Sequence, residues 1–298
     1  METIRPTREE FDTRASMVTE RMREYAYPYV ASISREAELN VGDHVGTGLY
    51  LRIRGESYLL TNEHVARAIC ETPLAHQLLQ GEGATRVMNP FLVAKHPYDM
   101  ALTRIVSAAW SDQKNVRRAL NVSHVGSKHA PEDCEFLFML GYSGQRSYFS
   151  PTFDMLINKG TPYLTQEAKD RPNDLPEMFF AIPYRPELAR SLNPNGANLP
   201  NPHGFSGSPV WDTNFQRCAL SGKRWFPEES RVTGIIIRWL EATGHLIAVR
   251  AEFIAEFLVY ALRCEAAYFH WIERGRPEND ALTDWAWAEE LIPDVATV

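Results

Sequence analysis

Ser206 lies in the segment NPHGFSGSPVWD, residues 201–212, where glycines stand close on both sides of it. A serine hydroxyl is a weak nucleophile unless a base removes its proton, and the base works best when a third group fixes its orientation. Gly and Ser are also ordinary turn formers, so the segment taken alone reads equally well as a polar turn. A catalytic role for Ser206 therefore requires a suitable histidine and a suitable acid elsewhere in the chain.

Two residues upstream meet this requirement. His64 lies in SYLLTNEHVARA, at the end of an apolar segment and at the start of a helical turn. Asp99 lies in KHPYDMALTRIV, directly before another apolar segment, where a short carboxylate can pack against an imidazole. Ends of strands hold side chains on rigid backbone, which suits a site. Taken singly, this histidine reads as a surface residue and this aspartate as a cap, but together with Ser206 they predict a base, an orienting acid and a nucleophile.

Competing chemistries have less support. An α/β-hydrolase needs the motif G-x-S-x-G, but Ser208 replaces the second glycine after Ser206, and GYSGQ fails in the same way at Gln145. His203 is so close to Ser206 that we expect it to line the cleft or shape the loop. Three further histidines are scattered along the chain: His96, His124 and His129. Since no H-E-x-x-H or paired metal-ligand spacing occurs, we expect neither a metal nor another cofactor.

Short apolar runs separated by Gly, Pro, Asn and Asp fill residues 28–250. This pattern predicts many short antiparallel strands and disfavours βαβ units. The roughly 220 residues of this stretch suit two six-stranded barrels or one large sandwich. The expected fold class is therefore an all-β core.

Helical patterns flank this core at both ends. Thr7 and Glu10 have the spacing of a capping box, which predicts a helix within residues 1–27 with an apolar stripe. A second helical pattern fills the start of residues 251–298 and stops at GRP, and a shorter helix begins near Asn279. The stripe residues expected in the two longer helices are Phe11, Ala15, Val18, Met22, Ile254, Phe257, Leu258, Ala261, Cys264 and Tyr268. These segments either dock a regulatory protein partner or cover the cleft, or they pack on the strands and protect their edges.

Composition limits the classes of partner and compartment. The formal net charge of −7 gives no basic surface for nucleic acid or anionic lipid. The charged first residues do not form a secretory signal, and no apolar run is long enough to cross a bilayer. The four cysteines lie far apart without a C-x-x-C pair, which predicts reduced, mostly buried thiols. We expect a cytoplasmic protein.

Four segments in one order resemble a known family. GTGLYLRIRGESYLLTNEHVA, HPYDMALTRI and GFSGSPVWD, followed by VTGIIIRW, resemble the signature segments of trypsin-like (chymotrypsin-fold) serine proteases. They resemble most of all the bacterial HtrA-like and glutamyl-endopeptidase-like branches. The resemblance spans about residues 41–250 and implies two perpendicular six-stranded antiparallel barrels, divided near residues 115–135, with the site between them.

The resemblance also implies roles for individual residues. Ser206 would be the nucleophile, His64 the general base and then acid, and Asp99 the residue that orients His64. The backbone N–H groups of Gly204 and Ser206 would form the oxyanion hole, and a glycine suits residue 204 because a side chain would obstruct the substrate carbonyl. The implied function is a serine endopeptidase acting on a protein or peptide through an acyl-enzyme. The alternatives are a catalytically silent trypsin-fold peptide-binding or scaffold protein, and a protease that stays silent until a partner binds.

The resemblance leaves the substrate preference open. Secreted relatives carry an aspartate before the nucleophile that receives a newly cut N-terminus, whereas this chain has Phe205 there and lacks that switch. The absence of an acidic residue in 191–205 argues against a preference for Lys or Arg. Arg238 would attract an acidic residue, and the isoleucines before it would instead form an apolar pocket. The residues expected to contact substrate are Asn201, His203, Phe205, Ile236, Ile237 and Arg238.

Overall fold

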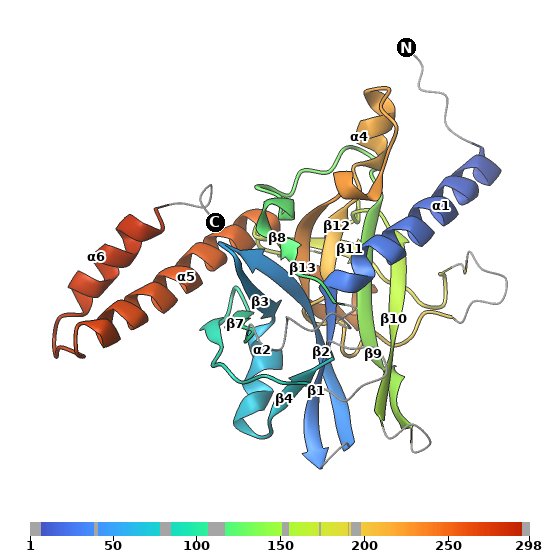
Figure 1. The fold of residues 1–298 in the computed structure, drawn as a ribbon. Helices are drawn as coiled ribbons and strands as arrows, with labels where there is room; N and C mark the ends of the chain where they lie inside the picture. Colours follow the sequence, from blue (N-terminus) through green and yellow to red (C-terminus); the bar gives the residue numbers. More distant parts are fainter. Residues whose placement is uncertain are drawn as a thin grey trace.

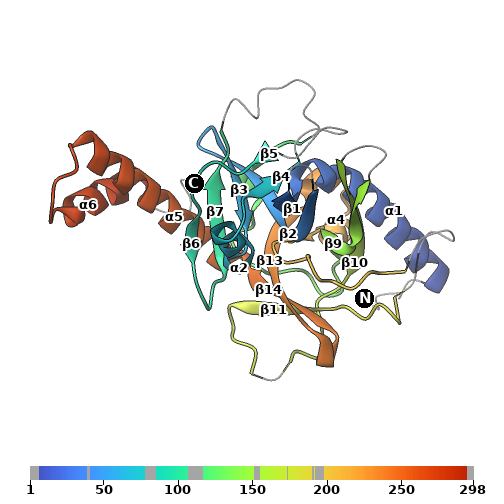
Figure 2. The ribbon, with the colours of Figure 1, turned by 90° about the horizontal axis from the view of Figure 1, so that it is seen from below.

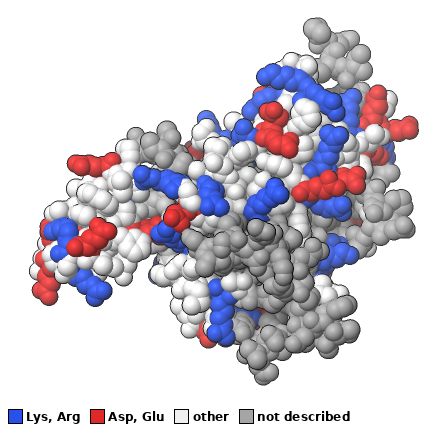
Figure 3. Space-filling model, in the orientation of Figure 1, with Lys and Arg blue, Asp and Glu red and all other residues white. Residues whose placement is uncertain are grey.

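The computed structural model describes residues 7–38, 41–77, 85–106, 117–150, 155–172, 174–189, 191 and 198–293. Two sheets occupy its centre, helix α1 lies beside the strands β9 and β10, and the helices α5 and α6 extend from the opposite side (Figure 1). On the face shown in Figure 3, basic and acidic side chains lie interspersed.

The first sheet follows the path β5-β4-β1-β2-β3-β7-β6, with β8 paired to β2. Its strands are β1 (Val30–Glu38), β2 (Val41–Ile53), β3 (Glu56–Thr61), β4 (Leu74–His76), β5 (Thr85–Arg86), β6 (Leu92–Ala94), β7 (Met100–Arg104) and β8 (Leu120–Asn121). The pairing of β8 with β2 is parallel, and the remaining pairings of this sheet are antiparallel.

The second sheet follows the path β10-β9-β12-β13-β14-β11 and is antiparallel throughout its described pairings. Its strands are β9 (Leu137–Ser150), β10 (Met155–Thr165), β11 (Phe179–Pro183), β12 (Pro209–Asp212), β13 (Arg231–Leu240) and β14 (His245–Arg250). The expectation of a β core with antiparallel sheets is confirmed. The expectation of six strands in the first barrel is wrong, because the first sheet has eight described strands. Within the described residues, no strand pairing joins the two ends of either sheet.

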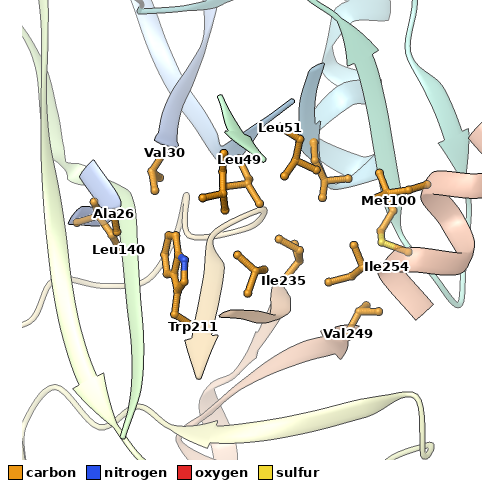
Figure 4. Close-up of a cluster of buried hydrophobic side chains, with 14 of the residues drawn as sticks. Ala26, Val30, Leu49, Leu51, Met100, Leu140, Trp211, Ile235, Val249 and Ile254 are labelled. Atoms are coloured by element: carbon orange, nitrogen blue, oxygen red, sulfur yellow. The ribbon is translucent and has the colours of Figure 1, made fainter. Parts of the chain in front are cut away.

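Apolar side chains on both faces of the strands explain the nearly continuous apolar runs in the sequence. In β2, Leu49 and Leu51 point into a core shared by the two sheets, whereas Tyr50 points into a core of the first sheet. In β13, Ile235 belongs to the shared core and Ile236 to a core of the second sheet. Neighbouring strand residues point to opposite faces, so each sheet covers one core of its own and one side of the shared core (Figure 4).

Helix α1 (Arg8–Ala26) begins with the predicted capping box. The Thr7 N–H donates to Glu10 Oε2 at 2.8 Å, and the Glu10 N–H donates to Thr7 Oγ1 at 3.3 Å. Its buried residues, Ala15, Val18, Met22 and Ala26, join the shared core. Phe11 differs from the expectation, because its side chain is exposed, although its ring contacts that of Phe136.

Helix α5 (Ala251–Glu273) is buried along its first half only. Ile254, Phe257, Leu258 and Ala261 are buried as predicted, but Cys264 is half-buried and Tyr268 is exposed. After Glu265, which contacts Tyr58 of β3, the helix passes beyond the sheets, and its second half packs against α6 (Ala281–Leu291) (Figure 2).

Short helical segments complete the described structure: α2 (Glu63–Ala66), α4 (Phe215–Leu220) and the 3₁₀ turns η1 (Tyr27–Tyr29), η2 (Arg67–Cys70), η3 (Val122–His124), η4 (Pro227–Glu229) and η5 (Glu241–Thr243). Within the described ranges, no helix has the length and apolar character needed to cross a membrane. The four cysteines form no disulfide. The expectation that most of them are buried is wrong, because only Cys218 is buried, whereas Cys70 and Cys134 are exposed.

Candidate active site

His64 and Asp99 meet because β3 and β7 pair antiparallel, with Thr61 opposite Ala101. The end of β3 therefore lies beside the start of β7. His64 Nδ1 lies 2.7 Å from Asp99 Oδ2, and the backbone N–H of His64 donates to Asp99 Oδ1 at 3.0 Å. A carboxylate only accepts, so His64 Nδ1 carries the proton in this contact.

The backbone of Asp99 is held in a special conformation. Its φ of +49° lies in the left-handed region, which aspartate tolerates better than most residues. Asn62 Nδ2 donates to the Asp99 carbonyl oxygen at 2.9 Å and so holds the turn from its own sheet. The Asp99 side chain is 23% exposed and the His64 side chain 41%, so the pair opens to solvent on the histidine side.

Around Ser206 the loop leaves two N–H groups available. The Phe205 N–H donates to the Pro202 carbonyl oxygen at 2.9 Å, and the Gly207 N–H donates to the Ile236 carbonyl oxygen at 2.8 Å. Within the described residues, the N–H groups of Gly204 and Ser206 donate no hydrogen bond. These two amides are therefore available as hydrogen-bond donors.

The Ser206 loop packs on the strand ends that lead to His64. The Thr47 N–H of β2 donates to the Ser206 carbonyl oxygen at 2.8 Å, and Thr61 Oγ1 of β3 donates to the Thr47 carbonyl oxygen at 2.7 Å. A Cβ atom on Gly207 would lie 1.9 Å from that Thr47 oxygen, so only glycine fits there. Ser206 is thus tied through Thr47 to Thr61, three residues before His64.

The hydroxyl of Ser206 donates no hydrogen bond to His64 Nε2 or to any other described group. Catalytic hydrogen bonds are often long in a free enzyme and shorten when the substrate binds. The structure therefore places the two residues on adjoining segments without closing the contact between them.

His44 supports the loop and is absent from the sequence-based prediction. His44 Nε2 lies 2.9 Å from the Tyr142 carbonyl oxygen and 3.3 Å from that of Gly204, and its Nδ1 lies 3.1 Å from Ser32 Oγ. Carbonyl oxygens only accept, so Nε2 carries the proton and Ser32 donates to Nδ1. Burial lowers the pKa of His44, which keeps the ring neutral. A polar ring in the apolar segment HVGTGLYL was the signal that could have identified it.

Gly204 is required for a different reason than the sequence suggested. Its φ of +99° strains any other residue, and a Cβ atom would lie 2.5 Å from His44 Nε2 and 2.9 Å from the Tyr142 carbonyl oxygen. The Gly204 carbonyl oxygen accepts from Thr47 Oγ1 at 2.8 Å. The close contacts of Gly204 are therefore with the protein interior behind the loop.

Three of the predicted substrate contacts are disfavoured by their burial. Phe205 and Ile236 are each 1% exposed within the core of the second sheet, and Ile237 is 6% exposed in the shared core. Both faces of β13 are covered, which buries Ile236 and Ile237, and Phe205 is buried in the loop by its packing into the core of the second sheet. This burial disfavours substrate contact by the three side chains, which stays a prediction.

The other three predicted contacts remain accessible. Arg238 and His203 are exposed, and Asn201 is half-buried. Asn201 Oδ1 accepts from the His203 N–H at 3.1 Å, and the His203 ring meets Trp239 edge to face with centroids 6.1 Å apart. His203 thus shapes the loop, and substrate contact by these three residues stays a prediction.

Within the described ranges, no group of three or more His, Cys, Asp or Glu residues is arranged to hold a metal ion.

Comparison with known proteins yields one short match and distant structural likenesses. Residues 265–293 match a family model described as "Protein of unknown function (DUF2934)". No curated protein matches the chain.

Among solved structures, the apo MamO protease domain from Magnetospirillum magneticum has a TM-score of 0.42 and 13% identity, covering 77% of this chain and 95% of that one. The tobacco vein mottling virus protease has a TM-score of 0.38 and 11% identity, covering 75% and 76%. A chain from work on the Sesbania mosaic virus VPg protein has a TM-score of 0.41 and 16% identity, covering 76% and 89%. A likeness this distant does not identify catalytic residues, so the proposed roles of His64, Asp99 and Ser206 depend on the geometry of the site.

Proposed function

We propose that this chain is a trypsin-like serine endopeptidase that hydrolyses peptide bonds with His64, Asp99 and Ser206. The observation that carries the proposal is the two-point hydrogen bonding of Asp99 to His64, at 2.7 and 3.0 Å. The Ser206 loop, with its two unpaired N–H groups, adjoins the segment that bears this pair. The order of the three motifs supports the same assignment.

In the proposed reaction, Asp99 holds the Nδ1–H of His64 so that Nε2 faces Ser206. Nε2 takes the Ser206 proton as Oγ attacks the substrate carbonyl carbon, and the N–H groups of Gly204 and Ser206 stabilise the resulting oxyanion. His64 then gives the proton to the leaving amine, and the peptide bond breaks. Water, deprotonated by the same Nε2, hydrolyses the acyl-enzyme and restores Ser206.

Fluorophosphonate labelling tests the proposal directly. We expect covalent labelling of the wild type at Ser206, detected by mass spectrometry, and none in Ser206→Ala. Ser208→Ala is the matched control, because the Ser208 hydroxyl is buried and has no hydrogen-bond partner among the described residues. A folded wild type that is not labelled, or labelling that survives in Ser206→Ala, would contradict the proposal.

The missing hydrogen bond between Ser206 and His64 favours one other candidate, a catalytically silent peptide-binding protein of the same fold. The same experiment separates the two, since the silent protein would bind peptides without being labelled by the fluorophosphonate. Partner-dependent activity would appear as labelling only after addition of a lysate.

A further inference from the structure

The start of α5 is held by the same strands that hold the Ser206 loop. β14 runs directly into α5 at Ala251, and β14 pairs with β13 through Ala248 opposite Ile236. The Ile236 carbonyl oxygen accepts the Gly207 N–H at 2.8 Å. The first turn of α5 is therefore positioned relative to Ser206 by a short, continuous set of hydrogen-bonded residues.

That first turn reaches across to the segment that bears Asp99. The rings of Phe253 and Tyr98 are in contact, with centroids 6.3 Å apart and planes inclined by 58°. Tyr98 directly precedes Asp99, and both of their N–H groups donate to the Lys95 carbonyl oxygen, at 3.1 and 3.3 Å. A shift of the Tyr98 ring therefore moves the turn that presents the Asp99 carboxylate.

Neighbouring contacts make this a packed junction. Ile254 of α5 and Met100 of β7 lie close together in the shared core (Figure 4). Further along α5, Glu265 Oε2 accepts from the Tyr58 hydroxyl of β3 at 2.7 Å. Burial raises the pKa of Tyr58, so its hydroxyl stays a donor. One helix thus contacts both first-sheet strands that lead to His64 and Asp99.

The hydrogen bonds of Asp99 itself stay within the first sheet. Its hydrogen bonds with Asn62 and His64 link it to its own sheet, whereas Phe253 links its turn to the helix that continues from the second sheet. The proposed reaction needs a base from one sheet and a nucleophile from the other, and a displacement of about 1 Å can cost about 100-fold in rate.

We infer that Phe253 is a positioning residue that aligns the Asp99–His64 pair with Ser206 by packing against Tyr98. This inference rests on the proposed function. Phe253 and Tyr98 are both half-buried, so shortening either ring opens no deep cavity.

The test measures the fluorophosphonate inactivation rate of the full chain against pH, with kcat and KM for a peptide substrate where turnover is found. We expect Phe253→Ala to lower the inactivation rate constant about tenfold or more and to move the pH midpoint of its profile, with KM unchanged. Phe253→Leu should recover most of the rate. Tyr260→Ala is the control, because Tyr260 is exposed on the same helix and packs against Trp285.

A folded Phe253→Ala protein with the wild-type rate and pH midpoint would overturn the inference and leave the proposed function intact. Failure of the wild type to react would overturn the proposed function instead. If Phe253→Ala does not fold, the less drastic Phe253→Val, Tyr98→Leu and the double variant carry the test. Losses that do not add in this cycle support the contact, and fully additive losses contradict it.

Discussion

At the scale of single residues, the site depends on groups whose roles follow from their neighbours. Asp99 gives both carboxylate oxygens to His64, one through the ring and one through the backbone, which fixes the position and the tautomer of the base. His44 is a second, half-buried imidazole, and its neutral ring holds the Gly204 carbonyl group from behind the loop. Of these two histidines, His64 is exposed beside Asp99 and His44 is half-buried against the loop.

Substrate preference can be tested at Arg238. The apolar pocket that the isoleucines suggested is disfavoured by the burial of Ile236 and Ile237, whereas Arg238 stays exposed two residues beyond the strand position that holds the Ser206 loop. We expect Arg238→Ala to lower kcat/KM for peptides with an acidic residue near the cleaved bond by about threefold to fivefold, since an exposed ion pair contributes under about 1 kcal/mol.

Neutral peptides should be cleaved by Arg238→Ala at an unchanged rate, and Arg231→Ala, at the other end of β13, serves as the control. An equal loss for acidic and neutral peptides would show that Arg238 does not select the substrate.

A pH-dependent contribution to stability is expected from His76. This ring is buried against the Tyr50 hydroxyl, 2.8 Å from Nδ1, and burial lowers the pKa of His76 to about 4. As the pH falls below about 6.5, the unfolded chain binds a proton that the folded chain refuses, so stability is lost down to pH 4, by about 3 kcal/mol for this site. Asp212 acts in the opposite sense. Burial raises its pKa to about 6, so its unfavourable contribution to the free energy of folding becomes smaller as the pH falls and the carboxylate is protonated.

Comparing the wild type with His76→Gln separates the pH-dependent stability contribution of His76 from that of Asp212. Urea unfolding at pH 7 and pH 4 should show the variant losing less stability than the wild type across this interval. Equal losses in the two proteins would mean that His76 is protonated in the folded state.

At the scale of elements, the terminal helices belong to the folded core to different extents. α1 inserts its apolar stripe into the shared core and contacts β9 and β10, and the first half of α5 does the same against β13 and β14. The far half of α5 and α6 keep exposed aromatic and apolar side chains, among them Tyr268 and Leu282. Of the two roles expected for the terminal helices, α1 and the start of α5 pack on the strands. A role in docking a partner stays a prediction.

Met22 tests whether α1 is an integral part of the fold. Its side chain is fully buried, with the Ser230 hydroxyl 3.2 Å from its sulfur. We expect Met22→Ala to lower the free energy of unfolding by about 2–5 kcal/mol, because burial is lost and a cavity remains. Arg21→Ala, on the exposed face of the same helix, should change it by less than about 0.5 kcal/mol. Equal urea midpoints for wild type and Met22→Ala would show that α1 docks only weakly.

At the scale of the whole molecule, the candidate site is built where the two sheets meet. The first sheet supplies His64 and Asp99, the second supplies the strands that flank the Ser206 loop, and Thr47 and α5 connect the two. Because each sheet also buries one face in the shared core, the relative position of base and nucleophile depends on the packing of that core. Changes far from Ser206, such as those at Phe253, are therefore expected to alter its reactivity.

The sequence by itself determined the β core and its flanking helices, and it singled out His64 and Asp99 as candidate residues beside strand ends. These follow from local patterns, namely apolar runs between turn residues, a capping box, and polar side chains placed beside strand ends. Such patterns act over a few residues, so they can be read without knowing what lies opposite them.

Only the tertiary structure decided which side chains are covered. Ile236 and Ile237 suggested an apolar pocket, but both are buried because the two faces of β13 are packed. His44 and Phe253 gained their roles from Gly204 and Tyr98, each more than 150 residues away in the chain. Contacts over such separations depend on how two sheets curve and pack, a property of the complete fold that no short stretch of sequence encodes.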